Sequence, residues 1–329
     1  MFSLNPYSAY QTLFDEKLND FLLSIDKTPA SLYQPMRYIF SLGGKRIRPL
    51  LVYIANDLFN GKTENATPIA LAVEIFHNFS LIHDDIMDKA PLRRGKTTIH
   101  EKWNNNVAIL SGDALLVTAY QQFEKVKTEK IISLLSIFSK TAAEVCEGQQ
   151  LDMDFEERKT ISIDEYQQMI TLKTAVLLGA ALKMGAVIAN ANEKDADALY
   201  HFGKNIGIAF QIQDDLLDVF GSAEKFGKQT GGDIICNKKT WLLIRAMQDA
   251  SPSDKAEMEK WIEQKEFLAK DKVEVFKNIY KKLNIKEKAE NEMKRYFENA
   301  KNNLFVVEAN YVKKETLLAF SEYLMKREN

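Results

Sequence analysis

The chain has 329 residues, of which 46% are hydrophobic and 27% charged, and this composition excludes a disordered or fibrous protein. Its 44 Lys and Arg residues nearly balance 46 Asp and Glu residues, so no overall positive charge is available to attract nucleic acid or an anionic membrane. With only 14 Gly and 7 Pro, long uninterrupted helices are expected. Any recognition of phosphate groups must therefore be local.

Helical periodicity dominates the chain from the N-terminus onwards. Apolar residues recur at spacings of three and four in Phe14, Leu18, Phe21, Leu22 and Ile25, and again in Ile131, Leu134, Leu135 and Phe138. Alternating β-branched runs bounded by Asn-Gly or Asp-Gly turns are absent, so no hairpin is expected. The highly charged stretch 251–298 predicts exposed helices around the core. We predict an all-α fold with residues 1–329 in a single domain.

The N-terminus and the cysteine content indicate a compartment. The first residues lack the basic segment and apolar core of a signal peptide, and only two cysteines, Cys146 and Cys236, are present. A cytoplasmic protein with reduced thiols is expected. The stretch most similar to a membrane span runs from Thr174 to Ala191, but Lys183 lies at its centre. We therefore expect a buried core helix and no transmembrane segment.

A short acidic pattern occurs twice. Residues 79–88 read FSLIHDDIMD and residues 210–218 read FQIQDDLLD, so an apolar helical segment ends in Asp-Asp-x-x-Asp each time. On a helix, Asp84 and Asp88 are about 40° apart around the axis and Asp85 is offset by about 100°, so all three carboxylates can reach one flank. One such cluster could be a solvated helix end, but two matched clusters favour a cation site.

The residue types in these clusters indicate the metal. Mg²⁺ prefers carboxylate oxygens and commonly completes its coordination with water and substrate phosphate. The spacing does not fit a calcium loop, and the four histidines and two cysteines show no zinc spacing. The pattern therefore predicts a site for magnesium and a diphosphate.

Two basic clusters could hold the phosphate groups. One is Gly43-Gly44-Lys45-Arg46-Ile47-Arg48-Pro49, whose glycines permit a tight turn. The other is Leu92-Arg93-Arg94-Gly95-Lys96, directly after the first acidic cluster. Arginine binds phosphate oxygens bidentately, although a lone basic turn is more often solvated surface.

Together these motifs resemble those of the trans-polyprenyl diphosphate synthase family. Its signatures are GGKxxRP, a DDxxD followed by RRG, a Lys-Thr pair, and FQxxDDxxD followed by GK and NK-type lysines, and all are present in order from Gly43 to Arg245. The resemblance implies a helical bundle of the isoprenoid synthase type around a central cavity. It also implies a magnesium-dependent prenyltransferase that adds isopentenyl diphosphate to allylic diphosphates, and a homodimer.

The resemblance also implies roles for individual residues. Those that resemble binders of isopentenyl diphosphate are Lys45, Arg48, His77 and Arg94. Those that resemble binders of the allylic diphosphate are Arg93, Lys173, Gln211, Lys228 and Lys238, with Thr174 near the reacting carbons. Those that resemble ligands of a cluster of several Mg²⁺ ions, three by the family pattern, are Asp84, Asp85, Asp88, Asp214, Asp215 and Asp218. Without the resemblance, His77 would be interpreted as a packing residue.

The residues before Asp84 bear on product length. On a helix, Phe79 lies about 7.5 Å and Phe76 about 12 Å before Asp84, so their rings could close the floor of a tunnel for the growing chain. Both rings could instead be core packing. Because Ser80 is not aromatic and the first DDxxD has no insertion, the resemblance favours geranylgeranyl diphosphate (C20), with farnesyl diphosphate (C15) as the alternative. A class I terpene cyclase and a non-catalytic partner subunit are weaker alternatives.

Overall fold

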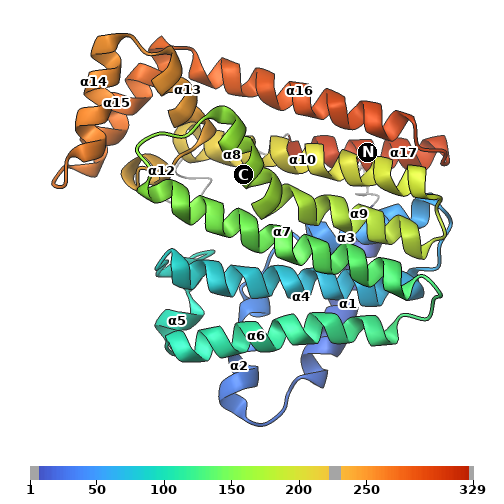
Figure 1. Ribbon diagram of the computed structural model, residues 1–329. Helices are drawn as coiled ribbons and strands as arrows, with labels where there is room; N and C mark the ends of the chain where they lie inside the picture. Colours follow the sequence, from blue (N-terminus) through green and yellow to red (C-terminus); the bar gives the residue numbers. More distant parts are fainter. Residues whose placement is uncertain (1–6, 222–230, 326–329) are drawn as a thin grey trace, which may run out of the picture. The chain divides into compact units, whose positions relative to one another are not determined.

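The computed structural model describes residues 7–221 and 231–325, and this part of the chain is mostly helical (Figure 1), as predicted. Two compact units can be distinguished. The first unit comprises Met1–Ala142, Leu177–Tyr200 and Val306–Leu317, and the second comprises Ala143–Val176, His201–Phe305 and Leu318–Asn329. The all-α class is confirmed, and the single domain stays a prediction.

The first unit contains the N-terminal helices and a small hairpin. Its elements are α1 (Ser8–Ser24), α2 (Ala30–Ser41), α3 (Ile47–Leu58), α4 (Thr63–Met87), β1 (Leu92–Arg93), β2 (Lys96–Thr97), α5 (Ile99–Lys102), α6 (Asn105–Gln121), the 3₁₀ turn η1 (Gln122–Lys125) and most of α9 (Val176–Ile188). Three further helices contribute residues to both units: α7 (Ile131–Glu157), α10 (Glu193–Phe220) and α17 (Tyr311–Met325).

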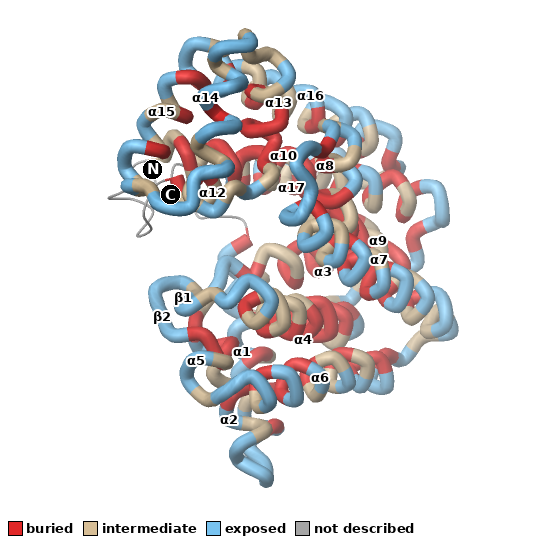
Figure 2. The backbone as a smooth tube through the Cα atoms, turned by 60° about the vertical axis from the view of Figure 1, so that its left-hand side comes forward, coloured by how far each residue is buried: buried red, intermediate tan, exposed pale blue. Residues whose placement is uncertain are grey.

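Helix α4 forms the centre of the first unit. It contacts α3 and α6, and most of its residues from Ala66 to Ile82 are buried, as the red and tan tube in Figure 2 shows. A helix that is apolar around most of its circumference must be covered on several sides, which explains this position. The acidic cluster follows at the C-terminal end of the same helix. The buried part of α4 thus continues directly into the predicted metal site.

The hairpin is a feature that the sequence interpretation missed. Strands β1 and β2 pair antiparallel, with Leu92 opposite Thr97 and Arg93 opposite Lys96. The turn residues Arg94 and Gly95 have φ angles of 52° and 74°. Two consecutive positive φ angles are typical of a type I′ turn, which Asn-Gly usually forms. The expectation of no hairpin was wrong because Arg94 adopts the left-handed conformation that Asn or Gly normally supplies.

The second unit contains the remaining helices. Its elements are α8 (Ile163–Ile170), the π-helical turn η2 (Thr171–Ala175), α12 (Gly232–Ile235), α13 (Trp241–Asp249), α14 (Pro252–Glu263), α15 (Ala269–Lys282) and α16 (Ile285–Phe305). Local signals account for several helix starts. Helix α8 begins with a capping box between Ser162 and Glu165, and α14 begins with a Ser251 cap followed by Pro252.

The charged stretch 251–298 contributes to the core of the second unit. Phe276, Tyr280 and Ile285 are buried and belong to one hydrophobic cluster with Trp241 and Leu242 of α13. Helices α14, α15 and α16 are exposed on their other faces, as predicted from their charge. The stretch is therefore an amphipathic cover whose apolar side closes the core.

The apolar stretch around Lys183 is largely enclosed by protein. Residues Ile163–Ile188 form a helical stretch long and apolar enough to span a membrane, but 72% of its most apolar window is buried. A core helix has the same composition because it is covered on all sides. The burial favours the predicted core helix.

Candidate active site

The basic turn between α2 and α3 has an unusual backbone. Gly43, Gly44 and Arg46 have φ angles of 81°, 143° and 49°. Within this turn Lys45 is exposed, whereas Arg46 is buried. Positive φ angles are accessible to glycine without strain, which explains the two glycines. The turn therefore directs two adjacent basic side chains to opposite sides.

Arg48, His77 and Arg94 converge on this turn. Nη1 of Arg48 lies 3.2 Å from Nε2 of His77. The guanidinium of Arg94 packs on Gly44, where a Cβ atom would lie 2.9 Å from Nη1, and Nη1 donates to the carbonyl of Gly43. Residues from the turn, from α4 and from the hairpin are thus brought together, as expected if they share a ligand.

The charge of this group favours an anion. Burial lowers the pKa of His77 well below its usual value, and the positive charges of Arg48, Arg94, Arg93 and Arg46 lower it further. Burial and the charges of Arg46 and Arg93 also lower the pKa of Arg94. Repulsion among several guanidinium groups would be relieved by a bound phosphate or diphosphate, whose oxygens Arg binds well.

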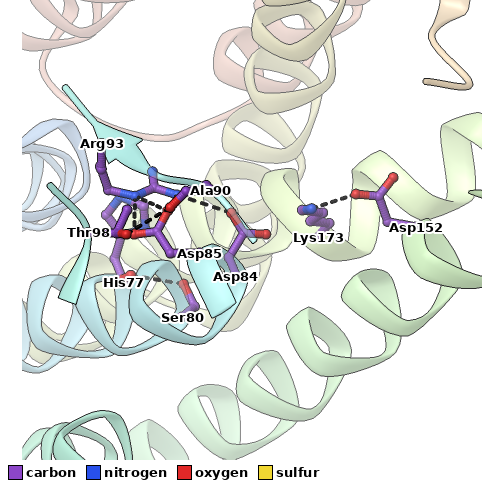
Figure 3. A network of polar contacts seen from close by, with 9 residues as sticks. All are labelled: His77, Ser80, Asp84, Asp85, Ala90, Arg93, Thr98, Asp152 and Lys173. Atoms are coloured by element: carbon purple, nitrogen blue, oxygen red, sulfur yellow. Dashed lines mark hydrogen bonds and ion pairs between the residues drawn. The ribbon is translucent and has the colours of Figure 1, made fainter. Parts of the chain in front are cut away.

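The first acidic cluster is held by Arg93 (Figure 3). Nε of Arg93 lies 2.8 Å from both carboxylate oxygens of Asp85, and Nη2 lies 3.2 Å from Oδ2 of Asp84. Asp85 is only 2% exposed, and burial raises its pKa although the hydrogen bond from Arg93 opposes this effect. Asp88 caps the same helix end, where the helix dipole adds negative charge. This end of α4 therefore attracts cations.

The second acidic cluster divides its carboxylates among different environments. Asp214 is exposed and Asp215 is buried, while Oδ2 of Asp218 accepts the backbone N–H of Asp233 at 3.0 Å. Oδ2 of Asp215 accepts from the Tyr166 hydroxyl at 2.6 Å and from the Trp241 N–H at 3.0 Å. Burial raises the pKa of Asp215 to about 6 despite these hydrogen bonds.

The carboxylates of Asp215 and Asp218 in the second cluster are therefore held by different partners. Within residues 7–221 and 231–325, no group of three or more His, Cys, Asp or Glu side chains is placed to hold a metal ion. In the first cluster the cation in contact with two of the carboxylates is the guanidinium of Arg93. The metal-ligand roles of the six aspartates stay predictions.

Lys173 and Thr174 lie in the π-helical turn η2. Nζ of Lys173 is 2.6 Å from Oδ2 of Asp152 on α7, and the hydroxyl of Thr174 donates to Oε1 of Gln211 at 3.2 Å. The amide of Gln211 in turn lies 3.5 Å from Oδ1 of Asp215. π-helical turns are rare and often mark functional sites. Hydrogen bonds thus link Thr174, Gln211 and Asp215, three of the predicted site residues.

Two glycines allow the π-helical turn to pack closely. A Cβ atom on Gly148 of α7 would lie 2.1 Å from the backbone nitrogen of Lys173. A Cβ atom on Gly207 of α10 would lie 2.6 Å from the Cα atom of Ala175. Backbone atoms cannot rotate away as a side chain can, so both positions require glycine.

Lys228 and Lys238 are the two lysines predicted after the second acidic cluster. The backbone N–H of Lys238 donates to the carbonyl of Asp233 at 2.9 Å, and its charge helps to lower the pKa of Asp215. Lys228 lies outside the described residues.

Phe76 and Phe79 belong to an aromatic cluster on α4. Their ring centroids are 5.5 Å apart, and Phe76 also contacts Phe138 at 5.5 Å. Phe76 is 1% exposed and Phe79 is 7% exposed, while the Phe79 ring lies 4.8 Å from that of His83. Phe79 thus lies between the buried ring of Phe76 and the acidic end of the helix, the order that a tunnel floor requires.

Comparison with known proteins identifies the family. The sequence profile of the family described as polyprenyl synthetase matches residues 29–283. The chain belongs to the polyprenyl synthetase family. This confirms the resemblance seen in the sequence and the prediction of an enzyme that transfers prenyl groups.

Three relatives illustrate how far this polyprenyl synthetase resembles known proteins. It is 37% identical over 305 residues to a geranylgeranyl diphosphate synthase of Sulfolobus acidocaldarius, covering 90% of this chain and 92% of that one. A crystal structure of a geranylgeranyl pyrophosphate synthase aligns with a TM-score of 0.93 and 42% identity, over 99% and 100% of the two chains. The corresponding enzyme of Corynebacterium glutamicum, complexed with isoprenyl diphosphate and magnesium, aligns with a TM-score of 0.87 and 27% identity, also over 99% and 100%.

Several residues of this polyprenyl synthetase site were not singled out from the sequence. Asp152 pairs with Lys173, and Tyr166 hydrogen-bonds to Asp215. Arg46 and Glu74 form a buried ion pair behind the basic turn. Asp152 and Tyr166 lie outside the recognised motifs. Arg46 stands within one, but only its burial distinguishes it from the other basic residues of that motif.

Proposed function

We propose that this polyprenyl synthetase condenses isopentenyl diphosphate with allylic diphosphates and forms geranylgeranyl diphosphate (C20) as its main product. Family membership supports the reaction, and the similarity to geranylgeranyl diphosphate synthases supports the C20 product. Farnesyl diphosphate (C15) is the alternative, because the fully buried Phe76 ring could shorten the space available to the product.

One observation carries the assignment of two substrates. Arg93 and Arg94 are adjacent in the hairpin, yet Arg93 contacts Asp84 and Asp85 whereas Arg94 contacts the glycine turn beside Arg48 and His77. One short hairpin therefore joins a basic group that suits a free diphosphate, around Arg94, to an acidic group that suits a diphosphate bound through metal ions, around Arg93. A terpene cyclase, which ionises a single allylic diphosphate, has no need for the second group.

Magnesium fits the acidic residues by their chemistry. Their carboxylates are hard oxygen donors at a negative helix end, and the first cluster already binds a positive group, the guanidinium of Arg93. We propose that Asp84, Asp85, Asp88, Asp214, Asp215 and Asp218 hold several Mg²⁺ ions through these oxygens. When bound, magnesium would neutralise negative charge on the diphosphate that leaves the allylic substrate.

The protein residues would perform the remaining steps. Arg93, Lys173, Gln211, Lys228 and Lys238 bind the allylic diphosphate, and their positive charges and N–H groups stabilise it as the allylic C–O bond breaks. Lys45, Arg48, His77 and Arg94 orient isopentenyl diphosphate so that its double bond attacks the allylic cation and a C–C bond forms. The proton then lost from the isopentenyl unit goes to the released diphosphate. No protein nucleophile is required.

The reaction can be tested directly. Purified protein is incubated with labelled isopentenyl diphosphate, dimethylallyl, geranyl or farnesyl diphosphate, and Mg²⁺, and the dephosphorylated products are separated by chain length. We expect geranylgeraniol, and none after chelation of the metal. Farnesol as the end product would establish the C15 alternative. Hydrocarbon formed without isopentenyl diphosphate would establish a cyclase, and no product from any starter would contradict the proposal.

We also propose that the enzyme acts as a homodimer in the cytoplasm. The homodimer rests on the family resemblance, and the cytoplasmic location rests on the presence of only two cysteines in 329 residues. Light scattering after size exclusion chromatography tests the first, with twice the 37.6 kDa chain mass expected. Cell fractionation tests the second.

A further inference from the structure

Arg46 lies between two predicted substrate-binding residues but points into the protein. Its side chain is 7% exposed and that of its partner Glu74 is 4% exposed. Neighbouring Lys45 is exposed and Arg48 is half-buried. Since the Arg46 side chain is turned inward, it cannot contact a substrate as its neighbours can.

Arg46 connects three elements of the first unit. Its Nη1 lies 2.6 Å from Oε1 of Glu74 on α4, and its Nη2 donates to the carbonyl of Phe40 near the end of α2 at 3.0 Å. Arg46 itself is the N-cap of α3. The side chain of Asn78 donates to Oε1 of Glu74 at 3.3 Å and to its carbonyl at 2.8 Å, so the acceptor is itself held in place.

This contact fixes a strained turn against the helix that carries His77. A non-glycine residue with φ of 49° is held in a conformation that costs about 1 kcal/mol. Glu74 precedes His77 by three residues, which places both on neighbouring parts of one helix face. Arg48, two residues after Arg46, contacts His77. The Arg46–Glu74 ion pair and the Arg48–His77 contact thus both connect the start of α3 to α4.

Stability alone does not account for such a pair. Removing two charges from water costs several kcal/mol each, and apolar residues of similar size often serve stability equally well. A bidentate guanidinium instead fixes direction, because its planar fork accepts only one arrangement of Glu74 and the Phe40 carbonyl. The geometry of the turn is therefore the property most sensitive to this pair.

We propose that the buried Arg46–Glu74 pair is a positioning element that sets Lys45 and Arg48 against His77 for binding the diphosphate of isopentenyl diphosphate. Neither residue touches the substrate. This inference rests on the proposed function, since it assumes that these three residues bind that substrate. The pair affects the binding of isopentenyl diphosphate only, because Arg93, which would bind the allylic diphosphate, is held by Asp84 and Asp85 instead.

The test is a double replacement, Arg46→Met with Glu74→Leu, which removes both charges and keeps the volume. Affinity for isopentenyl diphosphate is measured by isothermal titration in the presence of a chelator, and KM is measured for both substrates. We expect Kd and KM for isopentenyl diphosphate to rise at least tenfold, about 1.4 kcal/mol. The KM for farnesyl diphosphate should stay within about twofold of the wild-type value.

Further variants keep the test decisive. Glu74→Gln retains the side-chain shape and one hydrogen bond to Arg46, so it should fold even if the double variant does not, and it should show a smaller loss that is again confined to isopentenyl diphosphate. Arg46→Lys should lose less affinity for isopentenyl diphosphate than the double variant, but more than none, because one ammonium group cannot reproduce the planar fork of the guanidinium. The control Glu64→Gln, at an exposed position of the same helix, should leave the Kd for isopentenyl diphosphate and the KM values for both substrates unchanged.

Each result has a defined meaning. Unchanged affinity for isopentenyl diphosphate in a folded double variant, or in Glu74→Gln, would overturn the inference. Equal losses for both substrates, in parallel with a lower melting temperature, would also overturn it by showing a purely structural role. An inactive wild-type enzyme would instead contradict the proposed function, so the two failures can be distinguished.

Discussion

Replacing Phe79 with Ala should lengthen the product. If the allylic diphosphate binds at the acidic end of α4, the growing chain extends back along that helix and meets the Phe79 ring first. Phe76, three residues further along, is about 4.5 Å deeper by helical rise. That distance is close to the length added by one five-carbon unit. We therefore expect the main product to change from C20 to C25, with the Phe76 ring as the new floor.

The size of the effect follows from burial. Burying five further carbons gains about 4 kcal/mol at about 0.8 kcal/mol for each, which corresponds to roughly three orders of magnitude in favour of elongation. The Phe79 ring now opposes that gain by occupying the space. Loss of a ring that is 7% exposed should cost about 3 kcal/mol of folding stability and lower the melting temperature by several degrees.

The products are analysed by chain length after incubation with farnesyl and isopentenyl diphosphates below the melting temperature of the variant. Phe14→Ala is the matched control, because this fully buried ring packs on Tyr53 instead, and it should lower stability without changing the product. Adding Phe76→Leu to Phe79→Ala should lengthen the product again. An active double variant that still stops at C20 would show that these rings only pack the core.

Three further predictions concern charge. Asp84→Ala or Asp214→Ala should reduce kcat by at least about a hundredfold at saturating Mg²⁺ and leave the circular dichroism spectrum unchanged. The control Asp20→Ala, on the exposed face of α1, should leave kcat unchanged. Near-normal turnover of either aspartate variant would contradict the metal sites. Arg48→Ala should chiefly raise KM for isopentenyl diphosphate, and Lys173→Ala should chiefly impair binding or ionisation of the allylic diphosphate. Lys282→Ala, which removes another ion-paired lysine, is the control. Identical effects of the two variants on both substrates would show that the two residues do not serve different substrates. Because the pKa of His77 is lowered in the folded protein, the unfolded chain takes up its proton first, so this residue makes stability fall as pH drops below about 6.5. The His77 ring resonances should stay unshifted between pH 8 and pH 6, and a full titration near pH 6.5 would refute this.

The sequence predicted the helical class because the pattern of apolar residues follows the helix repeat. Phe14, Leu18 and Phe21 are all buried on α1, as their spacing requires. The motifs also placed Arg48, His77 and Arg94 in one functional group, and these three side chains do converge on the glycine turn. The helical class follows from local spacing and the proximity of the three side chains from whole motifs, while their roles in substrate binding stay predictions.

What the sequence did not show depends on contacts between distant residues. Arg46 and Arg48 are chemically identical, and only the left-handed turn directs the first inward to Glu74. Asp215 stands in the same motif as Asp214, yet the approach of Tyr166 from α8 gives it a buried environment. The hairpin was missed because its turn carries Arg94 where Asn is usual.

The close backbone contacts at the π-helical turn limit how this chain can vary, in evolution or in the laboratory. A π-helical turn contains one residue more than the regular helix would, and deleting it would rotate the preceding segment by about 100°. Any side chain larger than hydrogen at Gly148 or Gly207 would collide with the main chain of that turn. The two glycines and the extra residue can therefore change only together. Mutant libraries that diversify Lys173 and Thr174 should keep positions 148 and 207 constant, or most of their members will be lost to misfolding before substrate preference is ever selected.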